Sequence, residues 1–138
     1  MESNKLWEFP VPSTCIAEGG VKLIYPGGDA WLLFDYYDEN KNDAVFNSGI
    51  VFDAVQAHRH SSEKIIKSLL GAYDSLVEIK DSEWVAQLRE VNKEIADYWN
   101  IKHYAIFLDG NGLYEFIARD YKILETKEGS INGLFEVK

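Results

Sequence analysis

The sequence feature that most constrains the fold is a short polar turn, Asp109-Gly110-Asn111-Gly112, placed between two apolar segments. Glycine and asparagine tolerate a positive φ at little cost, and Asp-Gly and Asn-Gly pairs are typical of tight β-hairpin turns. In the flanking segments, 103–108 and 113–118, apolar side chains alternate in a way that gives each segment an apolar face. The chain is therefore predicted to contain an antiparallel hairpin.

Several other segments have the composition of strands. Residues 21–25 and 30–37 are rich in β-branched, aliphatic and aromatic side chains, and the turn residues Pro26-Gly27-Gly28 between them predict a second hairpin. Residues 48–60 have apolar side chains on both faces of a strand, and residues 75–80 alternate between apolar and polar. Two short tail segments, 121–124 and 134–137, complete the set of predicted strands.

The clearest helical pattern covers residues 82–99. Large apolar side chains recur at spacings of three and four from Trp84 to Ile95, and Ser82 is suited to cap the first turn. A shorter helix is predicted at 62–71, where serines and a glutamate precede four aliphatic residues. The segments together predict an α+β fold, a mostly antiparallel sheet with one long helix, about 82–99, packed on one face.

Length and composition predict a single domain, 1–138. The hydrophobic fraction is 46%, and no linker rich in Pro, Gly or Ser divides the chain. Residues 1–12, which hold Pro10 and Pro12, are predicted to form an extended lead-in. The sequence has one cysteine, Cys15, and no apolar run long enough to span a bilayer, and residues 1–9 lack the basic and apolar regions of a signal peptide, so none is expected. These features favour a cytoplasmic protein without a membrane partner.

The chain is acidic, with 14 Lys and Arg against 23 Asp and Glu and a formal net charge of −9. This charge repels a phosphate backbone, which argues against a nucleic-acid partner. It suits a basic protein partner, whose encounter it would accelerate, although acidity also serves solubility alone.

Aromatic residues make up 14% of the chain, more than a small core readily buries, so some of them are candidates for binding anchors. Carboxylates and tyrosines are interleaved where the strand predicted at 30–37 meets a polar loop, 38–43. We therefore predict a partner-binding site formed by Asp35, Tyr36, Tyr37, Asp38 and Glu39.

The segment His58-Arg59-His60 indicates an alternative, metal chemistry. On a strand, residues two apart point to the same side, so both imidazoles would project from one face. Two such histidines can hold a divalent transition metal if a further ligand arrives from elsewhere, and the candidates are His103, Asp35, Asp53 and Glu63. The structural alternative is that the two histidines pair with neighbouring acids.

Four blocks of sequence, 58–63, 73–79, 103–106 and 114–118, resemble a group of short bacterial proteins. Such proteins are similar in size and charge to the immunity partners of bacterial toxin systems. The resemblance covers roughly residues 30–120 and includes no catalytic motif. It implies a small bacterial cytosolic protein of the binding type.

The leading hypothesis is a protein-binding module, an immunity-type inhibitor that neutralises a toxin by occluding it and needs no cofactor. The alternative is a small metal-dependent enzyme or metal-binding protein centred on His58 and His60. A third hypothesis is a homo-oligomer, in which the partner is a second copy of the chain.

Overall fold

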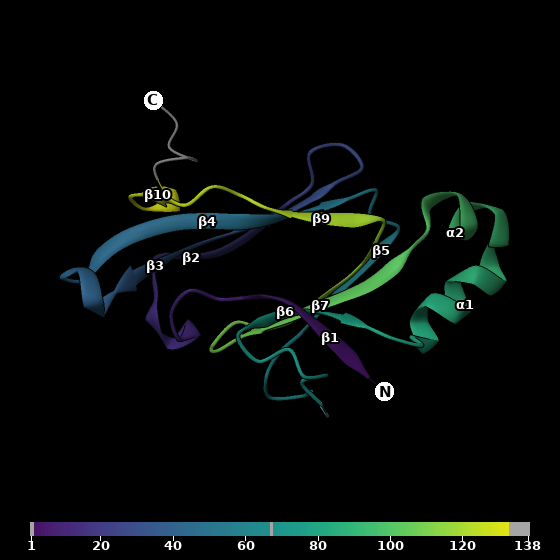
Figure 1. Cartoon of the computed structure of the whole chain (residues 1–138), viewed down its shortest axis with the longest axis horizontal. Coiled ribbons are helices and arrows are strands. Elements are labelled where there is room, and N and C mark those ends of the chain that lie inside the picture. Colours follow the sequence, from purple (N-terminus) through teal and green to yellow (C-terminus); the bar gives the residue numbers. More distant parts are fainter. Residues whose placement is uncertain (1, 67, 133–138) are drawn as a thin grey trace.

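The computed structural model describes residues 2–66 and 68–132. Two antiparallel sheets of five strands lie face to face, and two helices stand at one end (Figure 1). The first sheet has, in spatial order, β1 (Ser3–Glu8), β6 (Ser75–Ile79), β7 (Lys102–Leu108), β8 (Gly112–Ala118) and β5 (Ala57–Ser61). The second has β2 (Ile16–Ile24), β3 (Ala30–Asp38) and β4 (Ala44–Asp53), followed by β9 (Asp120–Ile123) and β10 (Lys127–Glu128), which both pair with β4. The predicted α+β class with mostly antiparallel strands is confirmed.

Both predicted hairpins form. β7 and β8 pair along their whole length, and the turn between them contains Gly110 and Gly112 at φ values of 76° and 104°. β2 and β3 pair across a turn in which Gly27 has a φ of 71°. In both turns glycine occupies a backbone region that disfavours other residues, which is why these short segments determine the strand pairing.

The segment 48–60, predicted as one strand, is divided between the two sheets. β4 ends at Asp53, Ala54 adopts a φ of 51°, and β5 then pairs with β8 in the first sheet. The apolar residues on both faces of this segment are explained by the crossing, because its two halves pack in different environments.

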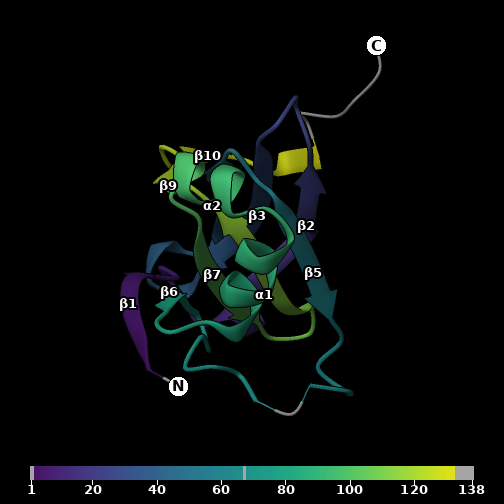
Figure 2. The same ribbon diagram turned by 90° about the vertical axis from the view of Figure 1, so that its right-hand side faces the viewer.

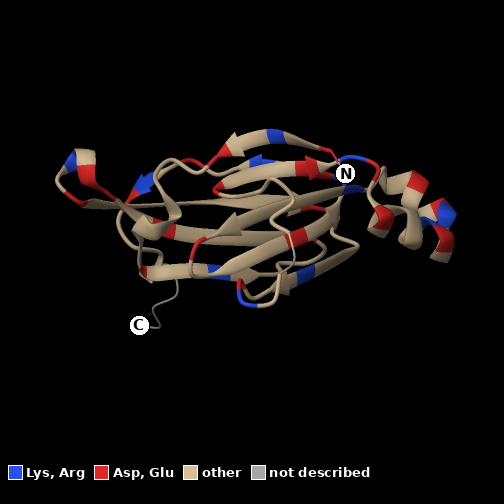
Figure 3. Cartoon of the chain, turned by 90° about the horizontal axis from the view of Figure 1, so that it is seen from below, with Lys and Arg blue, Asp and Glu red and all other residues tan. Residues whose placement is uncertain are grey.

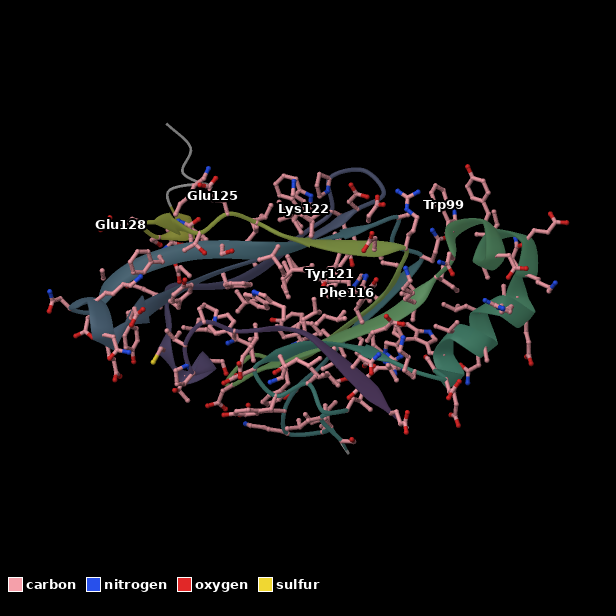
Figure 4. The ribbon with its side chains drawn as sticks, in the orientation of Figure 1. Trp99, Phe116, Tyr121, Lys122, Glu125 and Glu128 are labelled. Carbon is pink, nitrogen blue, oxygen red and sulfur yellow. The ribbon has the colours of Figure 1, made fainter. Side chains whose placement is uncertain are left out.

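The main core lies between the sheets. Leu32, Phe34 and Phe52 of the second sheet face Ile106 and Phe116 of the first, and all five are buried. The rings of Phe52 and Phe116 stack with centroids 4.1 Å apart, and Figure 4 shows Phe116 in this interlayer space. Each such side chain contributes about 1.5–3 kcal/mol through burial, so this layer is the main source of stability.

The N-terminal segment, predicted as an extended lead-in, is an edge strand. β1 pairs with β6, and Lys5 and Trp7 flank an irregularity in the register. Trp7 packs against Phe34, with ring centroids 6.0 Å apart, and Phe9 is buried just before Pro10. The lead-in therefore closes one side of the core.

The predicted long helix at 82–99 is wrong. The structure has two short helices, α1 (Glu83–Val91) and α2 (Lys93–Trp99), which meet at Asn92 (Figure 2). Asn92 has extended dihedrals, φ −154° and ψ 91°, and its side chain accepts a hydrogen bond from the Ile95 amide. Asparagine prefers such capping positions to helix interiors, so this residue ends one helix and begins the next.

The predicted short helix at 62–71 is also wrong for the residues that the structure describes, which form turns and loop. Ser62 Oγ accepts a hydrogen bond from the Lys64 amide, and Ser68 Oγ accepts one from the Leu70 amide. Local bonds of this kind compete with helical ones. Ile66, Leu69 and Leu70 nevertheless pack, partly buried, against the outer face of the first sheet.

Of the two tail strands, the one predicted at 121–124 corresponds to β9, and the one predicted at 134–137 lies outside the described residues. Within residues 2–66 and 68–132, the structure contains no helix with the length and hydropathy needed to cross a membrane.

Candidate functional site

The five residues predicted to bind a partner divide into two groups. Asp35 and Tyr36 are buried, at 0% and 4% exposure, whereas Tyr37 and Asp38 are half-buried and Glu39 is exposed. Asp35 lies on the outer face of β3 and accepts hydrogen bonds from within the chain, and Tyr36 packs in the main core. Only the last three residues reach the surface, at the tip of the β3–β4 hairpin.

The two histidines of the metal hypothesis lie on the inner face of β5. The His58 ring lies against Tyr25, with centroids 4.9 Å apart, and the His60 ring lies against Tyr114 at 4.5 Å. His60 Nε2 is 2.5 Å from the carbonyl oxygen of Asn111.

The third histidine does not join them. In the β-ladder His103 is opposite Ile117, whose side chain packs on the outer face, whereas His58 is opposite Phe116 of the inner core. Among the residues that the structure describes, no group of three or more His, Cys, Asp or Glu side chains is arranged to hold a metal ion. The metal hypothesis remains a prediction without added support.

We use the name helical cap for α1 and α2, residues Glu83–Trp99. The cap packs on the outer face of the first sheet, with Trp84, Leu88 and Trp99 against Ile117. Three large apolar side chains of the cap face solvent instead: Val91 is 81% exposed, Tyr98 75% and Ile95 42%. Beside them is a hollow of about 140 Å³. Its lining residues are Gln56, Leu88, Val91, Asn92, Ile95, Ala96 and Ile101.

Charged residues surround this apolar surface. Figure 3 shows acidic positions along both helices at one end of the molecule and in the β3–β4 hairpin at the other. Asp97 pairs with Arg89 at 3.5 Å and with Lys93 at 3.6 Å. Glu90 and Glu94 are exposed and have no ion-pair partner within residues 2–66 and 68–132, so the rim of the apolar surface keeps negative charge.

Beneath the cap lies a second feature, which we call the buried network: Ser82, His103, Glu115 and Arg59. Ser82 Oγ is 2.7 Å from His103 Nδ1, and His103 Nε2 is 2.8 Å from Glu115 Oε1. Arg59 binds the same carboxylate through Nε at 2.7 Å and Nη2 at 3.0 Å. Ser82, His103 and Glu115 are buried, while about half of the Arg59 side chain is exposed.

The carboxylate at the centre of the network is ionised. Burial alone would raise its pKa, but hydrogen bonds from His103 and Arg59 and the charge of Arg59 outweigh burial and lower the pKa of Glu115 from 4.5 to about 2. An ionised carboxylate only accepts hydrogen bonds, so the proton of the His103 ring lies on Nε2. In the neutral ring Nδ1 is then an acceptor, to which the Ser82 hydroxyl can donate, whereas a protonated ring donates from both nitrogens.

Trp84 forms the wall of the network. The Arg59 guanidinium lies over its ring, 4.3 Å from the centroid, and the His103 ring meets it edge-on at 5.4 Å. Arg59, Trp84, Ser82 and His103 also line a hollow of about 140 Å³ between α1 and the segment that precedes β6.

Sequence reasoning missed the buried network, and it placed Val91 and Ile95 of the cap on the packed face of a helix, whereas both are exposed. Arg59 was noted only as the residue between two histidines, although it stands directly opposite Glu115 in the β5–β8 ladder. The available signal was Glu115 itself, a charged residue among apolar neighbours in a predicted hairpin strand.

Comparison with protein-family models, curated proteins and solved structures finds no match for this chain.

Proposed function

We propose that the chain is a stoichiometric protein-binding module and that its helical cap docks a basic partner protein. The observation that carries the proposal is the exposure of Val91, Ile95 and Tyr98 beside an apolar hollow. Large apolar side chains gathered on one face are typical of interaction sites, and tyrosine is a common anchor at interfaces.

The spacing of these residues supports docking of an extended or helical segment. Ile95 and Tyr98 are three residues apart within α2 and so share one helical face, and Val91, at the end of α1, lines the same hollow as Ile95. Burial of each side chain by a partner would contribute roughly 1.5–3 kcal/mol, enough for the three to dominate affinity. The hollow beside them would receive one apolar side chain of the partner.

The charge of the surface selects the partner. The chain has a net charge of −9, and Glu90 and Glu94 stand at the rim of the apolar surface. A partner segment with apolar residues flanked by Lys or Arg is complementary to this arrangement, which also accelerates encounter at low salt. Inhibition of a toxin by covering its basic active-site rim is the form of this proposal that the sequence resemblance favours.

The test compares two baits in the same lysate of the source cell. Wild-type protein should retain a basic protein at one-to-one stoichiometry, and the double variant Val91→Ser, Tyr98→Ser should lose it. With the purified partner, each single variant should raise Kd at least about 10-fold, which corresponds to 1.4 kcal/mol. A higher salt concentration should weaken the wild-type complex. It should weaken the complex of the double variant Glu90→Lys, Glu94→Lys less.

Ile65→Ser is the matched control, because Ile65 is 75% exposed but lies outside the cap. It should leave both affinity and melting temperature unchanged. A partner that binds the cap variants normally but is lost on Tyr37→Ser or Glu39→Lys would place the site at the β3–β4 hairpin instead. If light scattering showed a dimer in the wild-type protein that the cap variants lose, the partner would be a second copy of the chain instead of a basic protein.

A further inference from the structure

Ser82 stands at a sharp junction between a strand and a helix. β6 ends at Ile79, Asp81 adopts a φ of 51°, Ser82 is the N-cap, and α1 begins at Glu83. A strand–turn–helix junction of this kind places a side chain at the positive end of the helix dipole. The Ser82 hydroxyl is therefore held where negative charge on its oxygen is favoured.

A base is in hydrogen-bond contact with this hydroxyl. Ser82 Oγ lies 2.7 Å from His103 Nδ1, where it can donate to the neutral ring, and Glu115 accepts from Nε2–H on the other side of the ring at 2.8 Å. A hydroxyl bonded to the free nitrogen of an imidazole, with a carboxylate that orients the ring, is the arrangement that activates a serine nucleophile. Glu115 is the positioning residue, and it fixes the tautomer that makes Nδ1 the acceptor.

Donors for a developing oxyanion lie beside Ser82. The Val85 amide donates to Ser82 Oγ at 3.2 Å, and the Ala86 amide makes the first intrahelical bond, to the Ser82 carbonyl. The amides of Glu83 and Trp84 have no acceptor in the part of the chain that the structure describes. Unpaired amides at a helix N-terminus are suited to bind a carbonyl oxygen that gains charge.

Two surface hollows reach the pair. The hollow beside Trp84 and Gln87 has about 140 Å³, and Ser82 and His103 line it. The same two residues line a second hollow of about 340 Å³, which extends past Lys80 and Arg89. A small acyl group fits this space.

We propose that Ser82 and His103 are the nucleophile and base of a hydrolytic site for small carboxylic esters, a function separate from partner binding. Ser82 Oγ attacks the carbonyl carbon and its proton passes to His103 Nδ1. The bond to the alkoxide leaving group breaks, and the leaving group takes that proton and departs as the alcohol. Water then attacks the acyl-serine, again losing its proton to Nδ1, and the acid is released as that proton returns to Ser82.

The test uses a fluorophosphonate probe and p-nitrophenyl acetate on the full chain. The probe should form one adduct, which peptide mass spectrometry places on Ser82, and p-nitrophenyl acetate should be hydrolysed with a burst of one equivalent. Ser82→Asn keeps an oxygen that can cap α1 but has no nucleophile, so it should lose both adduct and burst. Ser62→Asn is the same substitution at an exposed serine outside the network and the helical cap, and it should keep both.

His103→Gln should slow labelling of Ser82 by roughly 100-fold, the usual contribution of a general base. The 15N spectrum of the wild-type protein should show His103 as the Nε2–H tautomer, a signature that tests the role of Glu115 without a substitution. Folded wild-type protein without an adduct on Ser82 would overturn the proposal. So would equal labelling of the His103→Gln variant, or an Nδ1–H tautomer.

Discussion

Asp35 and Glu115 occupy corresponding places in the two sheets, yet the chain holds their charges in different ways. Each carboxylate lies on the outer face of its sheet under a covering segment, at 0% and 2% exposure. Within residues 2–66 and 68–132, the donors to Asp35 are neutral: the Gly20 amide at 3.1 Å, the Ser130 hydroxyl at 2.8 Å and the Ile131 amide at 3.1 Å. Glu115 instead accepts from an imidazole and a guanidinium.

The comparison shows that the hydrogen-bond donors around a buried carboxylate, more than its burial, determine its role. Amide and hydroxyl donors fix the chain around Asp35, and none of them titrates in the physiological range. The donors to Glu115 are a titratable ring and a half-exposed cation, and that ring is bonded in turn to a hydroxyl. Asp35 therefore holds the tail on the second sheet, whereas Glu115 orients groups that can react.

The largest expected effect is that of Glu115→Gln. Glutamine keeps one oxygen, which can still accept from His103, but it turns an NH2 group toward the Arg59 guanidinium and removes the negative charge that the guanidinium pairs with. We expect the free energy of unfolding to fall by about 3 kcal/mol in urea denaturation, as for other broken buried pairs. Glu90→Gln, an exposed substitution of the same chemistry, should change it by less than about 0.5 kcal/mol. Equal effects of the two substitutions would contradict the network.

Lowering the pH of the wild-type protein should remove the same contribution of the Glu115 carboxylate to the free energy of unfolding. The pKa of Glu115 is lowered from 4.5 to about 2, so the ionised form stabilises the fold fully above pH 4.5. That stability, about 3 kcal/mol, is lost as the pH falls from about 4.5 through about 2. Denaturation followed across this range should show the loss in wild type and a smaller one in Glu115→Gln. Parallel pH profiles of the two proteins would disprove the assignment.

A smaller loss of stability is expected when the packing around Asp35 is disturbed by a substitution at the neighbouring Gly19. A Cβ atom at Gly19 would overlap the Asp35 carboxylate and lie 2.8 Å from Ile131 Cγ1. Gly19→Ala should therefore destabilise the protein by about 2 kcal/mol, the usual cost of overpacking. Gly28→Ala is the matched control, because its Cβ would meet nothing within 4 Å, and thermal melts should show it as neutral or slightly stabilising. A neutral Gly19→Ala would show that the tail does not press on Asp35.

The strands of this fold could be predicted from the sequence where a short turn between them determines their pairing. The glycines at 110 and 112 fix the β7–β8 hairpin without reference to the rest of the chain. The prediction of one helix at 82–99 was wrong because the apolar spacing continues across Asn92, whereas the extended backbone of Asn92 and its capping bond from the Ile95 amide divide the segment in two. The prediction of a helix at 62–71 was wrong because Ile66, Leu69 and Leu70 can pack on the sheet from a non-helical backbone, so their spacing does not require a helix.

The site was less predictable, because it depends on contacts between distant residues. Asp35 looked like a surface acid beside tyrosines, and its burial depends on Ser130 and Ile131 near the other end of the chain. The buried network joins residues of β5, β7 and β8 with the cap of α1. Period and composition reveal which residues face inward, but they do not say which sheet or segment covers them.

The pairing of the edge strands also has a consequence for the time course of folding. Ser3 lies opposite Ile79, and Lys127 lies opposite Asn47, partners separated by more than half of the chain. Closing such long loops costs entropy before any contact is gained, so chains of this topology refold in milliseconds to seconds. During synthesis β1 is made well before its partner β6. Until β1 pairs with β6, the edge of β6 is unpaired, and strands of other chains can bind to it.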